Sequence, residues 1–277
     1  MKEHIKTGWE RENRTHFDEI VVNYDKVRWD YPQEMFDDIF KYSSLSNGKK
    51  AIEIGAGTGK ATTPILNEGY DVTAVELGTN MADFLLEKHK EYKNFNVMVS
   101  SFEDVTLTEG IYDLVYATSA FHWVDAEIGC PKVFRLLKPG GTFALLRNNF
   151  YSADGDALYE EIQAVYEKHY YSYYTSKSRL VRHSYEDLMK PSEVLKGFGF
   201  EDLRAYGFGD ISMKFYEKTL TYNADDYVAL MDTMSDKRKL PENNRTALYT
   251  GIKEAIIKHG GIYNQDTVFT LYMGRKL

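Results

Sequence analysis

A single ten-residue stretch, Ala51 to Lys60 (AIEIGAGTGK), constrains the fold more than any other part of this chain. It begins with small or β-prone apolar residues around one acid, continues with three glycines at alternate positions, and leads into a helical pattern over 60–66. The stretch therefore predicts a buried strand that ends in a tight loop at a helix N-terminus. Because the first N–H groups of a helix are unpaired, this end favours a polar or negatively charged ligand, and we expect a nucleotide-like cofactor.

Short apolar strands alternate with amphipathic helices from residue 49 to residue 147. We expect strands at 50–54, 71–76, 95–99, 112–118 and 141–147, and helices at 59–68, 79–91 and 126–137. This alternation is typical of an α/β fold with a mostly parallel sheet covered by helices on both faces. Ligands of such sheets bind beyond the carboxyl ends of the strands, where the strand order reverses. We expect the glycine loop at that edge.

The segments outside this core are expected to form a cap and to complete the sheet. Two helices, 14–24 and 33–42, precede the core. After Asn149 we expect helices at 156–170, 184–197, 224–234 and 241–259, strand-like residues within 200–216, and a last strand at 267–273. The expected organisation is one structural domain with a cap: a helical cap segment at 1–45, the core at 46–149, a cap insertion at 150–199, and C-terminal strands with a helical insertion at 200–277.

Composition limits the classes of function open to this chain. Its 277 residues carry a formal net charge of -8, which argues against a broad nucleic-acid surface. No apolar run is long enough to span a membrane, and the charged residues 1–12 do not resemble a signal peptide. The single cysteine, Cys130, excludes an internal disulfide and a multi-cysteine metal site. We expect a cytoplasmic protein with no metal, no nucleic-acid or membrane partner, and a small-molecule substrate.

The spacing of the glycines narrows the choice of cofactor. Lys60 stands where the dinucleotide-binding fingerprint has its third glycine, and no Gly-Lys-Ser/Thr follows at the spacing of a P-loop. Glu76 ends the second strand 23 residues after Glu53, and a carboxylate there can accept hydrogen bonds from both hydroxyls of a ribose. Residues 100–104 (SSFED) offer a backbone N–H, a carboxylate and an aromatic edge to an adenine ring. Glu76 as a helix cap and a solvated loop at 103–104 are the alternatives, but the features together predict an adenosine-containing ligand.

These motifs resemble those of the class I S-adenosylmethionine-dependent methyltransferases. The resemblance rests on residues 53–59, Glu76, residues 101–103, the strand at 113–119, and Leu-Lys-Pro-Gly-Gly at 137–141, whose glycines we interpret as a turn. A finer resemblance, to the type 11, trans-aconitate methyltransferase-like branch, rests on Ala-Phe-His-Trp-Val-Asp at 120–125 and on a helical tail that ends in Gly-Gly. Arg-Trp-Asp-Tyr-Pro at 28–32 departs from the Arg-Pro-x-Tyr-Pro that is frequent in that branch.

The family resemblance implies a fold and a cofactor site. The fold is a Rossmann-like, seven-stranded, mostly parallel sheet that ends in an antiparallel pair, here expected near 203–209 and 267–273. In the family, the glycine loop packs against the methionine part of S-adenosylmethionine, the second acid binds the ribose, and the residues after the third strand hold adenine. The cofactor contacts expected here, which would also hold the product S-adenosylhomocysteine, are Glu53, Gly55, Ala56, Gly57, Thr58, Gly59, Glu76, Leu77, Met81, Ser101, Phe102, Glu103 and Thr118.

Methyl transfer from a sulfonium is an in-line displacement, and it needs a general base only when the acceptor is protonated at neutral pH. His122, just past the fourth strand, is the candidate base, with contact to the pocket wall as the alternative; the other histidines, among them His89, are expected at the surface. An arginine in the site can pair with a carboxylate of the cofactor or of the substrate. The candidate substrate contacts are Tyr24, Arg28, Trp29, Tyr31, Trp123 and Arg147.

We expect a methyltransferase that acts on a small molecule, with an oxygen acceptor favoured over nitrogen or carbon. Three other hypotheses stay open. In the first, the enzyme methylates a nucleic acid or a protein. The Asn/Asp-Pro-Pro-aromatic motif of amino-methylating DNA enzymes is absent, however, because Ala-Thr-Ser-Ala at 117–120 stands at the end of strand four. The chain would bind the cofactor without catalysis and regulate a partner. A dinucleotide oxidoreductase is the fourth and most remote hypothesis.

Overall fold

The structure is a computed structural model that describes residues 17–18, 20–43, 49–152, 155–174, 184–191 and 202–277. The chain divides into two compact units. We call Asp30–Asn149, Glu186–Lys218 and Val268–Leu277 the core unit, and Met1–Trp29, Phe150–Tyr185 and Thr219–Thr267 the helical unit. The two units are described separately below.

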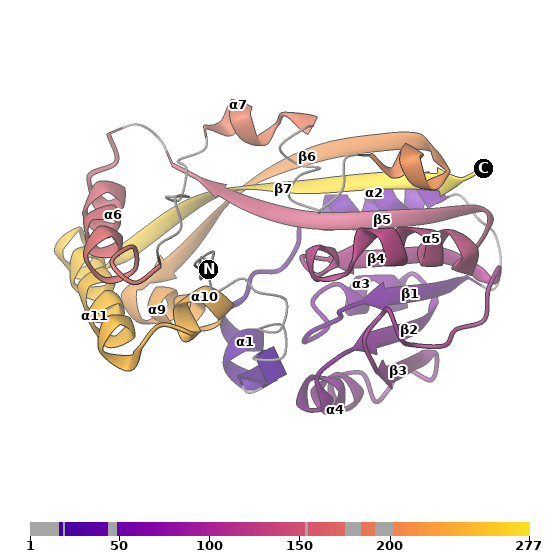
Figure 1. The fold of residues 1–277 in the computed structure, drawn as a ribbon, viewed down its shortest axis with the longest axis horizontal. Helices are drawn as coiled ribbons and strands as arrows, with labels where there is room; N and C mark the ends of the chain where they lie inside the picture. The colour runs from indigo at the N-terminus through magenta and orange to yellow at the C-terminus, as the bar shows by residue number, and fades with distance from the viewer. Residues whose placement is uncertain (1–16, 19, 44–48, 153–154, 175–183, 192–201) are drawn as a thin grey trace, which may run out of the picture. The chain divides into compact units, whose positions relative to one another are not determined.

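A seven-stranded sheet with the order β3-β2-β1-β4-β5-β7-β6 is the main feature of the fold (Figure 1). β1 pairs in parallel with β2 and β4, β2 with β3, and β4 with β5, whereas the last strands are antiparallel. This arrangement confirms the predicted Rossmann-like sheet. The strands are β1 (Lys50–Ile54), β2 (Asp71–Glu76), β3 (Phe95–Val99), β4 (Tyr112–Thr118), β5 (Leu137–Tyr151), β6 (Phe208–Asn223) and β7 (Ile262–Lys276).

Helices cover both faces of this sheet because its first strands are apolar on both sides. On one face, Ile52, Ile54 and Val115 share a hydrophobic core with Val133 and with other residues of helix α5 (Ala126–Leu136). On the opposite face, Ala74 of β2 packs with Leu85 of helix α4 (Thr79–Lys88). Helix α3 (Thr62–Asn67) contacts β2 and helix α2 (Gln33–Ser43). The sheet is therefore the middle layer of three.

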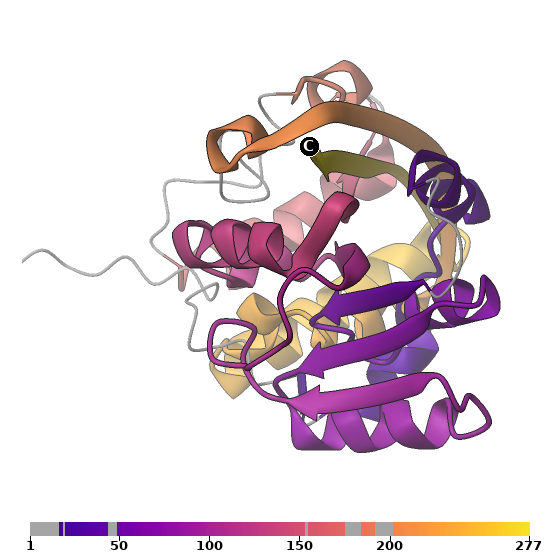
Figure 2. The same ribbon diagram turned by 90° about the vertical axis from the view of Figure 1, so that its right-hand side faces the viewer.

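The strand register brings the carboxyl ends of β1, β2 and β4 to one edge of the sheet, beside Leu146 of β5. Ile54 of β1 pairs with Val75 of β2 and with Ala117 of β4, and Thr118 at the end of β4 pairs with Leu146 of β5. In Figure 2 the arrowheads of β1, β2 and β3, the three indigo to purple strands, point the same way. Because β1 lies between β2 and β4, the strand order reverses at the glycine loop that follows β1.

The helical unit is built around its longest helix, α11 (Glu242–Lys258). This helix packs against α6 (Ala157–His169) and α9 (Ala224–Asp232), and α1 (Val21–Val27) packs against α9. A Cβ on Gly251 of α11 would lie 2.8 Å from Cγ1 of Val165, so the glycine allows the close approach of α6 and α11. The short helix α10 (Ser235–Arg238) follows α9.

Several predicted element boundaries are wrong in ways that have a local cause. Residues 138–141, interpreted as a turn, lie within β5, where Gly140 has a φ of 80° beside an irregularity in the β4–β5 register. The strand expected near 203–209 is wrong at its start. Residues Leu203–Tyr206 form the 3-10 helix η3, in which the Asp202 side chain accepts a hydrogen bond from the Arg204 N–H, and β6 starts only at Phe208.

Two predicted helices are shorter or shifted where they are described. The helix expected at 14–24 is described from Val21, where α1 begins, and it continues to Val27, while residues 14–16 lie outside the described residues. Within the range expected as 184–197, α7 covers Tyr185–Leu188, and residues 192–197 lie outside the description. Among the described residues, no helix is both long and apolar enough to cross a membrane, and no three His, Cys, Asp or Glu side chains gather as metal ligands.

Candidate functional site

The three glycines of the loop after β1 all have left-handed backbones. Their φ angles are 65° at Gly55, 57° at Gly57 and 78° at Gly59. A Cβ on Gly55 would lie 2.7 Å from the Cβ of Ala120, and a Cβ on Gly59 would lie 2.5 Å from Cε1 of His89. The first glycine therefore lets the loop after β4 approach the loop after β1, and the third lets helix α4 pack beneath it.

Glu76 at the end of β2 is fixed against the glycine loop. Its Oε2 accepts a hydrogen bond from the Gly57 N–H at 2.8 Å. Its Oε1 accepts from the N–H groups of Leu77 at 2.9 Å and Gly78 at 3.2 Å. The carboxylate is thus oriented at the edge where a ribose is expected.

The loop after β3 is held by its own side chains and by helix α5. Ser101 Oγ donates to Asp104 Oδ2 at 2.5 Å and accepts from the Asp104 N–H at 3.2 Å. Lys132 Nζ donates to the carbonyl oxygen of Glu103 at 3.2 Å. Phe102 is 3% exposed and belongs to the hydrophobic core on the α5 face. The side chain of Phe102 therefore fixes the loop from inside, and its predicted contact with adenine stays a prediction.

Glu53 lies beneath the glycine loop and is completely buried. Its Oε2 accepts hydrogen bonds from Thr62 Oγ1 at 2.5 Å and from the Tyr116 hydroxyl at 2.9 Å, and the β1–β4 register places Tyr116 directly beside it. Burial raises the pKa of Glu53 to about 8, against the opposing effect of these two hydrogen bonds. Its Oε1 and the Oγ1 of Thr58 are buried and have no hydrogen-bond partner among the residues that the structure describes. The base of the loop thus holds polar atoms that remain available to a ligand or to water.

The other predicted cofactor contacts divide between the sheet edge and the interior. Leu77 follows β2 and Thr118 ends β4, and both are partly exposed. Ala56 is 6% exposed and Met81, on α4, is 1% exposed. The structure thus brings the loop, Glu76, Leu77, Ser101 and Thr118 to the carboxyl ends of adjacent strands, while Glu53, Met81 and Phe102 lie underneath.

Ser119, just after β4, has an unusual backbone and connects three segments of the core unit. Its φ of 49° is in the left-handed region, which non-glycine residues seldom adopt outside functional or strained positions. Its N–H donates to the carbonyl of Leu146 at 2.8 Å. Its Oγ accepts from the Tyr31 hydroxyl at 3.0 Å and donates to Asn148 Oδ1 at 3.4 Å. Tyr31, a predicted substrate contact, therefore lies at the carboxyl end of β4.

The segment before helix α2 is also tied to the glycine loop. Asp30 forms an ion pair with Lys60, whose Nζ lies 3.0 Å from Asp30 Oδ1. The ring of Tyr31 packs edge-on against Phe269, with centroids 5.7 Å apart. Asp30 and Tyr31, which belong to the segment that departs from the pattern of the trans-aconitate-like branch, are thus held by contacts within the core unit.

His122 and Trp123 lie in the short 3-10 helix η2 (Phe121–Trp123) between β4 and α5. Their rings are 5.1 Å apart. Surrounding protein atoms, and then the positive charge of Arg147, lower the pKa of His122 to about 4. The side chain is also exposed to water. His122 is neutral at physiological pH.

Arg147 is a partly exposed residue of β5 with an unusual guanidinium group. Its Nη1 is buried and has no hydrogen-bond partner within the described parts of the chain, and burial lowers the pKa of the group. Side chains alternate between the two faces of a strand. Arg147 therefore continues the row of Phe143 and Leu145, which pack in the core on the α5 face. His122 precedes α5, and its electrostatic coupling to Arg147 agrees with this placement.

The predicted substrate contacts in the helical unit already interact with one another. The Arg28 guanidinium lies 4.8 Å from the centroid of the Tyr24 ring and 5.1 Å from that of Trp29. Arg28 also donates from Nε to Thr233 Oγ1 at 2.9 Å and from Nη2 to the Thr233 carbonyl at 3.0 Å. Trp29 is 9% exposed and packs edge-on against Phe150. These contacts bring Tyr24, Arg28 and Trp29 together, and their role toward a substrate stays a prediction.

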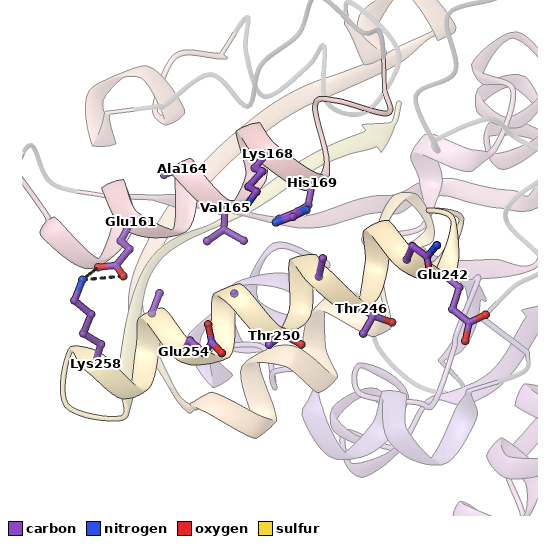
Figure 3. A pocket seen from close by; sticks show the side chains of 14 residues that line it. Glu161, Ala164, Val165, Lys168, His169, Glu242, Thr246, Thr250, Glu254 and Lys258 are labelled. Atoms are coloured by element: carbon purple, nitrogen blue, oxygen red, sulfur yellow. Dashed lines mark hydrogen bonds and ion pairs between the residues drawn. The ribbon is translucent and has the colours of Figure 1, made fainter.

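An open groove of about 970 Å³ lies between α6 and α11 in the helical unit (Figure 3). At one end, Lys258 Nζ donates to both carboxylate oxygens of Glu161, at 3.0 and 2.8 Å. The remaining lining is mostly polar or charged, and none of the predicted site residues contributes to it. The groove is therefore separate from the residues at the carboxyl ends of the strands.

Sequence reasoning missed three polar residues of this edge and misplaced a fourth. Tyr116 carries a hydroxyl between the apolar residues Val115 and Ala117 of β4, a signal that it pairs with a buried group. Thr62 and Ser119 carry no comparable signal, because their roles depend on backbone geometry. His89 was expected at the surface, which is wrong: it is 1% exposed, with Nδ1 3.0 Å from the Leu85 carbonyl and Nε2 2.9 Å from Thr63 Oγ1. The missing side chain of Gly59 makes room for it.

Comparisons with known proteins agree with this geometry. Residues 52–145 match the model of a family described as a methyltransferase domain. An uncharacterized methyltransferase of Schizosaccharomyces pombe is 25% identical over 251 residues, which are 90% of this chain and 90% of that protein. An uncharacterized methyltransferase of Mycobacterium tuberculosis is 32% identical over 132 residues, or 48% of this chain. The matched region spans about half, 51%, of the mycobacterial protein.

Solved structures share the fold over most of this chain. A protein from Anaeromyxobacter dehalogenans described as a type II methyltransferase has a TM-score of 0.58 at 20% identity, covering 90% of this chain and 98% of that one. Phosphoethanolamine N-methyltransferase 2 of Haemonchus contortus, in complex with phosphomonomethylethanolamine and S-adenosylhomocysteine, has a TM-score of 0.52 at 16% identity. That match covers 98% of this chain and 60% of the Haemonchus chain. At these identities the likeness shows the fold alone.

Proposed function

We propose that this class I S-adenosylmethionine-dependent methyltransferase, whose residues 52–145 belong to the methyltransferase domain family, methylates an oxygen atom of a small molecule. The observation that carries the cofactor assignment is the carboxylate of Glu76, which is held by the Gly57 N–H at the point of strand-order reversal. An acid fixed there can bind both hydroxyls of a ribose. The membership in the trans-aconitate-like branch stays a prediction.

The residues at the carboxyl ends of the strands fit the parts of S-adenosylmethionine. The glycine loop leaves room for the amino-acid tail, and Glu53 Oε1 beneath it, which has no hydrogen-bond partner among the described residues, can form one hydrogen bond with a ligand or with water. Glu76 would bind the ribose, and the backbone at Ser101–Glu103 would hold adenine. When bound, the cofactor supplies a methyl group on a positively charged sulfur, which leaves as a neutral thioether.

The task of the protein is then to hold the acceptor atom in line with the methyl group and to exclude water. Ser119, His122 and Arg147 surround the carboxyl ends of β4 and β5, next to the glycine loop through the Gly55–Ala120 contact. Neutral His122 can orient an acceptor as a hydrogen-bond partner or accept its proton. The first role suits an acceptor that is already ionised, and the second suits an alcohol.

The charge of this edge favours oxygen over nitrogen as the acceptor atom. An aliphatic amine is a cation at neutral pH, and the unpaired positive charge of Arg147 opposes its approach to His122. An oxygen acceptor that is an anion is attracted to the same charge. The net charge of -8 supports a small molecule rather than a nucleic acid as the substrate.

A methylation assay with groups of acceptors tests this function. The protein is incubated with S-adenosylmethionine and with separate mixtures of carboxylic acids, phenols, aliphatic amines, peptides and tRNA, and S-adenosylhomocysteine and methylated products are measured by mass spectrometry. The amine mixture includes phosphomonomethylethanolamine, which the Haemonchus enzyme binds. We expect product from an oxygen-bearing small molecule. Product from amines or macromolecules alone, or no product above the acceptor-free control, would contradict the proposal.

A further inference from the structure

Arg147 is a partly exposed cation whose Nη1 is buried, and no described residue supplies it with a counterion. A guanidinium carries five N–H donors, and its transfer from water is unfavourable unless those donors are paired. The buried Nη1 has no partner among the described residues, and no carboxylate forms an ion pair with this side chain in the same part of the structure. A guanidinium that has no paired carboxylate can bind an anion from solution.

The position of Arg147 relates it to the acceptor rather than to the cofactor. The cofactor loop follows β1, and β4 lies between β1 and β5. Two strand spacings separate the β1 and β5 rows by about 10 Å. Arg147 comes directly after Leu146, whose carbonyl accepts from the Ser119 N–H, and its charge acts on His122. The side chain of Arg147 therefore lies on the α5 face of the sheet, near His122 and beside the carboxyl end of β4.

The two side chains next to Arg147 cannot replace an external anion. His122 is neutral, so it neither repels an anion nor neutralises the guanidinium. Asn148, the next residue on β5, alternates to the other face and accepts from Ser119 Oγ through its Oδ1. An incoming oxyanion would thus find one full positive charge and no competing carboxylate at this position.

We propose that Arg147 is the specificity residue that binds an oxyanion of the methyl acceptor, so that the substrate is a small organic anion bearing a carboxylate or a phosphate. This inference rests on the proposed function. In the reaction, a lone pair of the acceptor oxygen forms a bond to the methyl carbon while the carbon–sulfur bond breaks, and its electron pair stays on sulfur. When the ionised oxygen itself is methylated, no proton is released and no base is required.

The first experiment measures binding without turnover. Acetate, benzoate and inorganic phosphate are titrated separately into the protein saturated with S-adenosylhomocysteine, and the imidazole signals of His122 are followed by NMR across pH. Binding of an anion at Arg147 offsets the positive charge, so the pKa of His122 should rise. Arg147→Gln should abolish both the anion-dependent shift and the binding, whereas Arg135→Gln, the same change at a surface arginine paired with Glu109, should preserve both.

The second experiment measures kinetics with any acceptor found in the methylation assay. Arg147→Gln removes a charge-assisted, bidentate pair with the acceptor oxyanion. We therefore expect it to raise KM for a carboxylate or phosphate acceptor on the order of 10- to 100-fold. The dissociation constant of S-adenosylhomocysteine should stay within twofold, and Arg147→Lys should restore part of the loss. The carboxylate and phosphate arms identify which oxyanion the site prefers.

The outcomes separate this inference from the proposed function. Turnover of neutral phenols or alcohols with an unchanged KM in Arg147→Gln would overturn the role of Arg147 and leave the methyltransferase function standing. Weakened S-adenosylhomocysteine binding with an unchanged acceptor KM would assign Arg147 to the cofactor and overturn the inference. If no acceptor is turned over, the titration still decides, because a failure of all three anions to shift His122 through Arg147 contradicts an oxyanion site.

Discussion

Glu53→Gln should change how the stability of the protein depends on pH. Glu53 is completely buried, and burial raises its pKa from 4.5 to about 8. Between these two values the folded state holds a proton on this carboxyl that the unfolded state has released. The free energy of unfolding therefore falls as pH rises through this window, and it stops falling above the pKa of the folded state.

The size of the effect follows from the same two values. At about 1.36 kcal/mol for each tenfold change in proton concentration, the window from 4.5 to about 8 corresponds to roughly 5 kcal/mol as an upper limit. Glutamine keeps one oxygen to accept from Thr62 Oγ1 and the Tyr116 hydroxyl. Burying its amide N–H groups lowers the free energy of unfolding by an amount that does not depend on pH. The test is therefore how the difference in unfolding free energy between Glu53→Gln and wild type changes with pH.

Urea unfolding followed by tryptophan fluorescence between pH 5 and 9 provides the assay. We expect the stability of Glu53→Gln relative to wild type to increase by about 3 to 5 kcal/mol from pH 5 to 8 and to level off above that. Glu68→Gln is the control, because Glu68 is a partly exposed carboxylate that pairs with Lys49. Its difference from wild type should not grow with pH. Parallel pH curves for wild type and Glu53→Gln would refute the reasoning.

Three further variants test other parts of the site. In Gly55→Ala the new Cβ would sit on a residue with a φ of 65° and lie 2.7 Å from the Cβ of Ala120. Because this strain and clash would displace the loop, the affinity for S-adenosylhomocysteine, measured by calorimetry, should fall at least about tenfold. With an ionised acceptor, His122→Ala should lower kcat by less than about tenfold, whereas loss of a general base would lower it by roughly 10²-fold or more. In the wild-type enzyme, kcat/KM plotted against pH should show no inflection near the usual histidine pKa. Tyr31→Phe removes the hydrogen bond to Ser119 Oγ and should lower the free energy of unfolding by about 1 kcal/mol, measured by urea unfolding, whereas an unchanged stability would contradict the role of that bond.

Local patterns in the sequence were enough to predict most of the strands and helices of the core unit. The strands β1 to β4 have the predicted limits, because each is a short apolar run bounded by polar residues or glycine. The predicted helix at 126–137 is observed as α5, Ala126–Leu136, and the side chain of Asp125 caps its start by accepting a hydrogen bond from the Glu127 N–H. These features depend on neighbouring residues, so a sequence without a structure is enough to predict them.

The features that were missed depend on contacts between distant segments. The left-handed Ser119 arises where its N–H meets Leu146 and its hydroxyl meets Tyr31, residues that are far away in the chain. The burial of His89 depends on the empty space over Gly59. The unpaired guanidinium of Arg147 is visible only once the absence of a nearby carboxylate is known for the described residues. Such properties require the tertiary arrangement.

Binding of S-adenosylhomocysteine to wild type and to Glu76→Gln, measured by isothermal titration calorimetry, tests the central claim most directly. A carboxylate that binds both ribose hydroxyls predicts one site per chain and a loss of affinity of at least about tenfold in the variant. Glu68→Gln, at the carboxyl-terminal end of helix α3 and paired with Lys49, should bind as wild type does. If the wild-type protein does not bind the cofactor product, or if Glu76→Gln binds it equally well, the proposed cofactor site is wrong.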